Sequence, residues 1–490
     1  MTYRNLINGE LCGTASGRSL PNVNPANFHE VLGYVPQSTA GELEDAVAAA
    51  KAAYPSWKHT PAPKRGDLLL KAVAAFDKRK EAIARVLAQE EGKTYREALG
   101  EVQKGINVLE FQAGQGRRIS GYARESELVR NFAYTKKEPL GVVGLITPWN
   151  FPFAIPVWKM GPALVSGNTV VWKPSELTAA TAQHIAEVFL EAGFPKGVVN
   201  VVHGLGPEVG EALARHPHVR ALSFTGSNAV GQKMYRLGAE RGIKVQCEMG
   251  GKNAIIVLDD ADLELAAIAT AQGAFGSTGQ RCTATSRAIV QESIADAFVQ
   301  KVLAQMEGIV AGDPLDPKTT MGPQVSEPQL QKVLQYQDVG RSEAQLVRGG
   351  GRLTAGALAH GWFSEPTLFD HVAPTARIAT EEIFGPVLSV IRVKDFDEGL
   401  EVANGTEFGL SSSLYTNDYA KVFQYADRIE TGICHVNSPT MGGEAHLPFG
   451  GMKSTGIGGR EMNEEAIDFY TETKVIYFDY TGMKRTSNVY

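Results

Sequence analysis

The stretch GVVGLITPWNFPFAIPVWKMGPALVSGNTVVWKPSE, residues 141–176, places two short apolar, β-branched runs on either side of a helical pattern. Each run is continuously apolar and ends in a polar turn, which is typical of strands buried on both faces of a parallel sheet. The same alternation continues with a helix from residue 178, then GVVNVVHG, a further helix and VRALSFTGS. It predicts parallel βαβ units over residues 141–250.

A second alternation of strands and helices begins after residue 250. It includes RAIVQE, a helix from residue 294, and the strands FGPVLSVIRV and ICHVNS, which predict a second α/β unit. Ahead of the first unit, residues 40–57 and 64–93 carry Ala, Leu, Val and Phe at three-to-four spacing between charges. We expect these segments to be amphipathic helices on a domain surface.

Two aromatic segments with alternating polarity stand apart from both units. They are RNFAYTKKEPL at 130–140 and DFYTETKVIYFDY at 468–480. A strand of this kind needs a partner, so we expect the two to form a small sheet at an oligomer interface.

The composition indicates a large soluble enzyme that acts on small molecules. The chain has 490 residues, 43% of them hydrophobic, and a formal net charge of -6, which makes nucleic acid or an anionic membrane an unexpected partner. The beginning MTYRNLINGE has no apolar core of signal-peptide length, and no apolar run approaches the roughly 18 residues of a spanning helix. We therefore expect a cytoplasmic protein.

The cysteines and histidines do not form a metal-binding pattern. Cys12, Cys247, Cys282 and Cys434 are widely separated and show no CxxC spacing, so reduced thiols are the simplest interpretation. There is no HExxH motif, and HPH at 216–218 is typical of a loop between elements. We predict no catalytic metal.

Cys282 stands out from the other thiols by its neighbours in GSTGQRCTATSR, residues 276–287. A cysteine in such a protein is more often a small buried hydrophobe than a nucleophile. Here Gly276 and Gly279 allow close approach of the backbone to a ligand, and the hydroxyl and amide groups around Cys282 would be unusual in a dry core. The pattern favours a nucleophilic thiol at a polar cleft.

Two polar residues at expected strand ends are candidates to assist that thiol. Glu248, in QCEMGGKN, is either a surface charge or a partly buried base whose pKa burial would raise. Asn150, in the PWNFP turn, makes either local turn hydrogen bonds or a preorganised donor to an oxyanion.

Three further features suit a nucleotide. Lys173 at a strand end is either simply exposed or a donor to ribose or phosphate, and Glu176 either accepts from ribose hydroxyls or serves as a helix N-terminal acid. FTGSNAVG, residues 224–231, opens a helix whose free N–H groups could receive phosphate, although it is not GxGxxG.

Taken together, these segments resemble the aldehyde dehydrogenase superfamily. The motifs TPWNFP, WKPSE, FTGSNAVG, EMGGKN, GQRC, EEIFGPV and LPFGGMKSTGIGGRE occur in the family's order over nearly the whole chain. The resemblance implies an α/β fold of two parallel-sheet, Rossmann-type domains with a small β-hairpin for oligomerisation, and a homodimer or homotetramer. The implied parts are a dinucleotide-binding domain (1–120 and 141–250), a catalytic domain (251–455) and oligomerisation segments (121–140 and 456–490).

The resemblance also implies roles for individual residues. Cys282 is the nucleophile, Glu248 the general base and Asn150 an oxyanion donor. The implied cofactor-binding residues are Thr147, Trp149, Lys173, Ser175, Glu176, Phe224, Thr225, Gly226, Ser227, Gly231, Met249, Glu382 and Phe384. The expected reaction oxidises an aldehyde to a carboxylic acid through a thiohemiacetal and a thioester on Cys282.

The residues expected near Cys282 indicate two different kinds of substrate. Phe151, Trp158 and Phe449 fall where the family lines its aldehyde tunnel with aromatic rings, which suits an apolar or aromatic aldehyde. Arg281 either faces the tunnel and binds a distal carboxylate or faces the protein as an ion-pair donor, and we favour the tunnel.

The segments AIPVWK, GQRCTATSR and AHLPFGG are most similar to the branch of the aldehyde dehydrogenase superfamily that oxidises 2-oxoglutarate semialdehyde (2,5-dioxopentanoate). We therefore expect an ω-oxo acid semialdehyde. Succinate semialdehyde dehydrogenases commonly have arginine where this chain has Trp158, and that enzyme, like a broad-range aromatic or aliphatic one, is an alternative.

Glu176 favours NAD, because a carboxylate at the adenine ribose repels a 2'-phosphate, while Ser175 and Lys173 leave NADP open.

Three other functions are alternatives. A catalytically silent relative would be expected to lack the thiol or the base, and a thiol hydrolase would leave the cofactor residues unused. A coenzyme A-acylating enzyme usually lacks the glutamate that stands here at Glu248.

Overall fold

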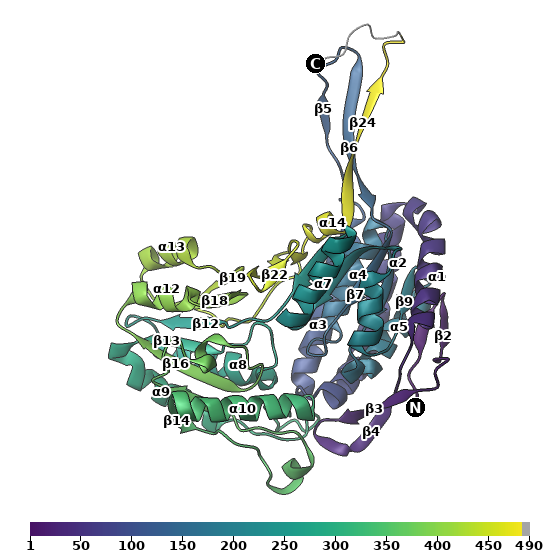
Figure 1. The fold of residues 1–490 in the computed structure, drawn as a ribbon. Coiled ribbons are helices and arrows are strands. Elements are labelled where there is room, and N and C mark those ends of the chain that lie inside the picture. The colour runs from purple at the N-terminus through teal and green to yellow at the C-terminus, as the bar shows by residue number, and fades with distance from the viewer. Residues whose placement is uncertain (483–490) are drawn as a thin grey trace.

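Two mixed sheets, one in each half of the molecule, organise the fold (Figure 1). The computed structural model describes residues 1–482, and the expected oligomerisation residues 483–490 lie outside the described part. The strands of the first sheet, in spatial order, are β2 (Glu10–Cys12), β1 (Asn5–Ile7), β9 (Val199–Val201), β8 (Thr169–Lys173), β7 (Val142–Ile146), β10 (Val219–Thr225), β11 (Lys244–Glu248) and β22 (Gly456–Ile457).

The five central strands of this sheet, β9 to β11, are parallel, as the apolar runs predict. The edges differ from the expected all-parallel sheet, because β1 pairs antiparallel with both β9 and β2, and β22 pairs antiparallel with β11. These edge strands have two or three residues each, too few to carry a periodic signal in the sequence.

The second sheet also has a parallel centre, but one of its edges alone is antiparallel. Its strands, in spatial order, are β14 (Gln345–Arg348), β15 (Thr367–Asp370), β16 (Val387–Val393), β13 (Arg287–Gln291), β12 (Ala254–Val257), β18 (Ser411–Tyr415) and β19 (Ile433–Val436). Only the pairing of β14 with β15 is antiparallel. The predicted second α/β unit is therefore present.

Helices cover both faces of each sheet. Those packed on the first sheet are α1 (Ala40–His59), α2 (Ala62–Glu91), α3 (Tyr95–Gln115), α4 (Ala154–Ser166), α5 (Ala179–Glu191), α6 (Glu211–Arg215) and α7 (Asn228–Arg241). Those of the second half include α8 (Leu263–Phe275), α9 (Glu292–Glu307), α10 (Glu327–Glu343), α12 (Phe396–Asn404) and α13 (Tyr419–Arg428). The predicted helices at 40–57 and 64–93 correspond to α1 and α2.

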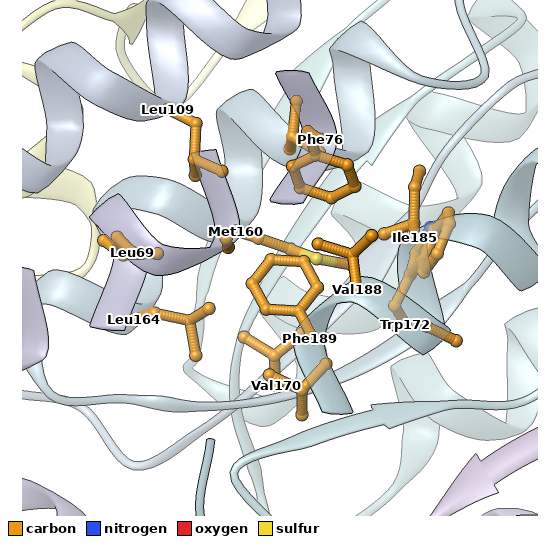
Figure 2. Packing of buried hydrophobic residues seen from close by; sticks show 14 of the residues in the cluster. Leu69, Phe76, Leu109, Met160, Leu164, Val170, Trp172, Ile185, Val188 and Phe189 are labelled. Atoms are coloured by element: carbon orange, nitrogen blue, oxygen red, sulfur yellow. The ribbon is translucent and has the colours of Figure 1, made fainter. Parts of the chain in front are cut away.

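The central strands bury side chains on both faces. On β7, Val143 and Leu145 pack with α2, α3, α4 and α5, whereas Val142 and Ile146 pack with α1, α6 and α7. Because successive side chains of a strand point to opposite faces, a run that is apolar at every position needs a helical layer on each side. Figure 2 shows the first of these cores, where Phe76 of α2, Met160 of α4 and Phe189 of α5 meet Val170 and Trp172 of β8.

A three-stranded arm projects from this body (Figure 1). It joins β5 (Ala123–Glu125), β6 (Asn131–Pro139) and β24 (Thr471–Asp479), and the predicted pairing of the two aromatic segments runs from Thr471 opposite Pro139 to Asp479 opposite Asn131. The segment expected to begin at residue 456 enters the arm only at Thr471, because residues 456–457 form β22 at the edge of the first sheet.

Residues 1–482 contain neither a membrane-spanning helix nor a metal-binding cluster. Among these residues, no helix combines the length and apolar character needed to cross a bilayer. Within the same part of the chain, no three His, Cys, Asp or Glu side chains come together in a way that could hold a metal ion.

Candidate active site

The carboxyl ends of the parallel strands of the first sheet meet at one edge, where ligands of parallel sheets bind. Ile146 at the end of β7 is level with Lys173 of β8, and Thr225 of β10 is level with Glu248 of β11. Beyond these ends lies a cavity of about 170 Å³ that also receives loops from the second half. Its lining residues are Pro148, Trp149, Asn150, Thr225, Gly226, Ser227, Met249, Gly250, Cys282, Gln329, Lys332, Glu382 and Phe384.

This cavity brings together nine of the predicted residues, among them Cys282 and Asn150. The motifs around Asn150, Ser227, Met249, Cys282 and Glu382 are far apart in sequence and border one space. The predicted residues outside its lining are Thr147, Phe151, Trp158, Lys173, Ser175, Glu176, Phe224, Gly231, Glu248, Arg281 and Phe449.

Cys282 follows a sharply turned segment. Ser277 and Thr278 have φ values of 47° and 56°, and Gly279 has φ 68°. A Cβ at Gly279 would lie 2.2 Å from the Gly385 carbonyl oxygen, so the turn requires glycine where the two loops meet. Such strained turns concentrate at functional sites.

The Cys282 thiol is neutral in this arrangement. Burial raises its pKa to about 12; the positive charge of Lys104 opposes this shift and the negative charge of Glu248 adds to it. Because the thiolate is the nucleophile, attack by Cys282 requires removal of its proton at neutral pH.

Asn150 is buried and held at both its side chain and its backbone. Its Nδ2 donates to the Gln280 carbonyl oxygen at 3.2 Å, and its own carbonyl accepts from Lys93 Nζ at 2.7 Å. An amide nitrogen carries two hydrogens, so one N–H of Asn150 remains for another acceptor.

A buried ion pair that the sequence did not reveal fixes the turn around Asn150. Lys93 Nζ lies 2.6 Å from Glu101 Oε2, and both side chains are almost fully buried. Glu101 Oε1 accepts the backbone N–H groups of Phe153 at 2.9 Å and Ala154 at 3.2 Å, where α4 begins. The pair therefore joins the start of α3 to the start of α4.

Glu248 is buried at the end of β11, as its place before a glycine pair suggested. Its Oε2 accepts the Gly451 N–H at 3.2 Å, and its buried Oε1 has no hydrogen-bond partner among residues 1–482. A Cβ at Gly450, whose φ is 153°, would lie 2.4 Å from Oε1, so glycine there leaves room for the carboxyl group. Burial, reinforced by the negative charge of Glu461, raises the pKa of Glu248 well above its ordinary value.

Lys173 and Glu176 lie together at the end of β8. Lys173 Nζ donates to the Pro174 carbonyl oxygen at 2.8 Å and to Glu176 Oε2 at 3.3 Å. Lys173 is buried, whereas Glu176 is partly exposed as the first residue of a short 3-10 turn. Ser175 Oγ accepts the Leu177 N–H at 3.2 Å, which caps that turn. Thr147 Oγ1 accepts from Trp172 Nε1 at 2.8 Å and supports the floor of the site.

The start of α7 fits an anionic ligand. Ser227 is the N-cap residue, but its side chain makes no capping hydrogen bond, and the buried Thr225 hydroxyl has no partner among residues 1–482. A Cβ at Gly231 would lie 2.3 Å from Met249 Sδ and 3.3 Å from the Phe224 ring, so glycine lets the helix pack against these side chains. Free N–H groups at a helix start, beside an unused hydroxyl, suit the phosphates of a dinucleotide.

The second half of the molecule supplies Glu382 and Phe384. Glu382 Oε1 accepts the Gly251 N–H at 3.0 Å, and burial raises the pKa of its carboxyl group. Phe384 has φ 60° and meets the Trp149 ring edge-on, with the ring centres 5.4 Å apart. Gln329 Nε2 donates to the Phe384 carbonyl oxygen at 2.8 Å and supports this unusual backbone.

An apolar cluster packs against Cys282. It joins Trp158 and Phe449, whose ring centres are 5.4 Å apart, with the partly buried Phe151 and Cys282. The predicted aromatic residues therefore gather beside the thiol. Lys104 of α3, which the sequence did not single out, lies against the Trp158 and Phe449 rings.

Arg281 does not take the direction favoured from the sequence. Its Nη2 lies 3.1 Å from Glu97 Oε1, and its Nε donates to Ser277 Oγ at 2.9 Å. Both Arg281 and Glu97 border a separate cavity of about 770 Å³ that Cys282 and Asn150 do not line. The structure therefore contradicts the expected orientation of Arg281 toward the aldehyde tunnel, because its guanidinium group is already paired with the Glu97 carboxylate.

Comparison with known proteins matches this arrangement to one family. Residues 13–476 match the aldehyde dehydrogenase family. The alpha-ketoglutaric semialdehyde dehydrogenase of Bacillus subtilis is 45% identical over 97% of this chain and 98% of the relative, and the alpha-ketoglutarate semialdehyde dehydrogenase of Haloferax volcanii is 43% identical over 97% and 99%.

Solved structures agree with these sequence matches. An NAD-dependent aldehyde dehydrogenase from Sinorhizobium meliloti has a TM-score of 0.96 at 37% identity, covering 100% of this chain and 97% of its own. Betaine aldehyde dehydrogenase from Staphylococcus aureus, in complex with NAD+, has a TM-score of 0.96 at 34% identity, covering 99% and 96%. The family resemblance and the fold class are therefore confirmed, and the chain belongs to the aldehyde dehydrogenase family.

Proposed function

We propose that this aldehyde dehydrogenase oxidises an ω-oxo acid semialdehyde, such as 2-oxoglutarate semialdehyde, with NAD as the electron acceptor. The observation that carries the proposal is the cavity shared by Cys282, Asn150, Met249, Glu382 and Phe384, which puts a thiol beside the expected nicotinamide residues. The names of the Bacillus subtilis and Haloferax volcanii relatives support the substrate class.

In the proposed reaction, the Cys282 thiol gives up its proton to solvent water, and Sγ attacks the aldehyde carbon and forms a thiohemiacetal. The free N–H of Asn150 Nδ2 and the Cys282 backbone N–H donate to the oxygen that becomes negative. Lys93 and Gln280 fix Asn150, so the donor is aimed before the substrate arrives.

A nicotinamide bound beside Cys282 supplies the acceptor for the hydride that leaves the former aldehyde carbon. The aldehyde carbon is then a thioester carbon on Cys282. Glu248 takes a proton from water, the hydroxide displaces the Cys282 thiolate, and the carboxylic acid is released. The unpaired Oε1 of Glu248 is available to bind that water.

The cofactor choice rests on Glu176. Its partly exposed carboxylate at the end of β8 can accept hydrogen bonds from both ribose hydroxyls, and it would repel a 2'-phosphate. The uncapped start of α7 and the unused Thr225 hydroxyl would hold the pyrophosphate.

We also propose a homodimer or homotetramer that assembles through the arm. Its residues leave large apolar side chains exposed, among them Phe132, Val475, Tyr477 and Phe478. Exposed strands with such side chains are typical of an interface between copies.

The test is a panel of aldehydes assayed with NAD and with NADP. We expect kcat/KM for 2-oxoglutarate semialdehyde to exceed that for butanal or benzaldehyde by about tenfold or more, with NAD preferred. Succinate semialdehyde in the panel tests the related substrate. C282A should lose turnover and keep cofactor binding, and reduced cofactor forming without Cys282, or an ester hydrolysed with no aldehyde oxidation, would contradict the mechanism.

A further inference from the structure

Within residues 1–482, Lys104 is a cation beside the proposed aldehyde site that forms no ion pair with a carboxylate. It belongs to α3, and its Nζ lies 5.6 Å from the centre of the Trp158 ring and 5.8 Å from that of Phe449. Among residues 1–482, no hydrogen bond or ion pair to the Lys104 ammonium group is found, so the aromatic faces are its described neighbours.

The ammonium group is close to the place of reaction. Trp158 and Phe449 pack in the same apolar cluster as Cys282. The charges of Lys104 and Cys282 also influence each other: the Lys104 ammonium lowers the pKa of the thiol, while burial lowers the pKa of Lys104 itself. On its other side, a Cβ at Gly443 would lie 3.3 Å from Nζ, so the loop before Phe449 covers the cation closely.

Three other cations near the apolar cluster have carboxylate partners. Lys93 pairs with Glu101, Lys159 with Glu461 and Arg281 with Glu97. Removing an ammonium group from water is costly unless an anion or hydrogen bonds compensate, and two ring faces compensate only in part. Lys104 is therefore placed to bind an anionic group of the substrate.

We propose that Lys104 binds the distal carboxylate of the semialdehyde while Trp158 and Phe449 contact its methylene groups. The proposal rests on the proposed function, and it assigns to Lys104 the role that Arg281 cannot take while it is paired with Glu97. The charge pair would form in a site partly shielded from water, where a charge-assisted hydrogen bond is strong.

A different role for Lys104 has a different signature. If its charge served only to lower the pKa of the Cys282 thiol, its loss would slow the oxidation of every aldehyde to the same degree. If it binds the substrate carboxylate, its loss affects acidic aldehydes alone, chiefly through KM.

The experiment compares wild type, K104M and K104R with 2-oxoglutarate semialdehyde, succinate semialdehyde and the neutral aldehydes pentanal and butanal. We expect K104M to lose about 10- to 100-fold in kcat/KM for the acidic substrates, mainly in KM, and less than about threefold for the neutral ones. K104R, which keeps the charge, should recover part of the acidic activity. K80M is the matched control, because Lys80 of α2 donates to Gln103 and lines neither the cavity nor the apolar cluster, and it should behave as wild type.

The outcomes separate this inference from the proposed function. If the wild type does not prefer acidic aldehydes, the proposed substrate class and the role of Lys104 are both wrong. If the wild type prefers them and K104M keeps the preference, only the role of Lys104 is wrong. Equal losses for acidic and neutral aldehydes would also overturn it.

Inhibition by glutarate gives a second measurement, because this dicarboxylate cannot react. Its inhibition constant should rise about tenfold or more in K104M and much less in K104R. An unchanged constant in K104M would contradict the proposal, whatever the variant does to turnover.

Discussion

At the scale of single residues, the protonation of Glu248 sets a limit on the proposed hydrolysis. Its carboxyl group must be ionised to accept a proton from water, but burial and the negative charge of Glu461 raise its pKa well above the ordinary value. Turnover should therefore fall as pH decreases through this raised pKa, above the range of an exposed carboxylate. The measurement is kcat against pH under saturating substrate.

E248Q tests the same residue without a pH change. We expect one rapid burst of reduced cofactor, followed by steady turnover about 100- to 10,000-fold slower, because the thioester forms and is not hydrolysed. Glutamine also avoids placing a charge in this buried site. Because the pKa of Glu248 is raised in the folded state, the folded protein loses stability as pH rises from the unfolded-state pKa to the folded-state pKa of this group. E248Q lacks this loss, so it should melt no lower than wild type at pH 8. Rapid steady turnover in E248Q would exclude Glu248 as the base.

Glu176 should decide between NAD and NADP. E176Q removes the charge that would repel a 2'-phosphate and releases Lys173, which lies 3.3 Å from that carboxylate, to attract it. We expect kcat/KM to fall for NAD and to rise for NADP, so that their ratio shifts by about tenfold or more. E208Q is the control, because Glu208 is a partly exposed carboxylate paired with Arg18. A wild type that prefers NADP would show that Glu176 turns away from the ribose.

The sequence could predict which residues gather here better than which way they point. Asn150, Cys282 and Glu382 stand in turns rich in glycine and proline, and such turns are recognisable without a structure. Lys104 lies in a helix with ordinary amphipathic spacing, and its importance comes from rings that are distant in sequence. The direction of Arg281 depends on Glu97, a partner that no local pattern identifies.

At the scale of elements, the buried pair of Lys93 and Glu101 should couple stability to catalysis. K93M leaves Glu101 buried without its counter-charge and removes the donor to the Asn150 carbonyl. We expect a loss of about 3–5 kcal/mol in the free energy of unfolding and a lower kcat. Urea unfolding and steady-state kinetics measure the two effects.

The double variant K93M/E101Q separates these effects. Its glutamine keeps an acceptor for the N–H groups that begin α4 and removes the uncompensated charge of Glu101, so part of the stability should return. The low kcat should persist, because the Asn150 turn still lacks Lys93. Full recovery of kcat would show that the pair acts on stability alone.

The elements themselves were predictable where they are long or continuously apolar. β7, β8 and β10, together with α1 and α2, lie where the apolar patterns placed them. The short edge strands β1, β2 and β22 were not foreseen, because their hydrogen bonds join segments far apart in the chain. Tertiary contacts, which a local pattern does not contain, determine such strands.

At the scale of the whole molecule, the arm should control assembly. Phe132 of β6 lies opposite Phe478 of β24 in the antiparallel pairing, and their rings are exposed. Tyr134 and Ile476 continue the same face two residues along each strand, and the Phe132 and Tyr134 rings stack at 5.7 Å. An exposed aromatic face on a projecting sheet is stable in water when a second copy covers it.

F132D/F478D should therefore prevent assembly and spare the fold. We expect the wild type to have the mass of a dimer or tetramer in light scattering coupled to gel filtration, and the double variant to shift to a smaller species. Two like charges at one cross-strand position also repel each other, so the arm loses stability whereas the two sheets of the body do not. L265D is the control: Leu265 is a single exposed apolar side chain on α8, and its replacement should leave the mass unchanged. A monomeric wild type, or an unchanged mass in F132D/F478D, would show that the arm does not hold the copies together.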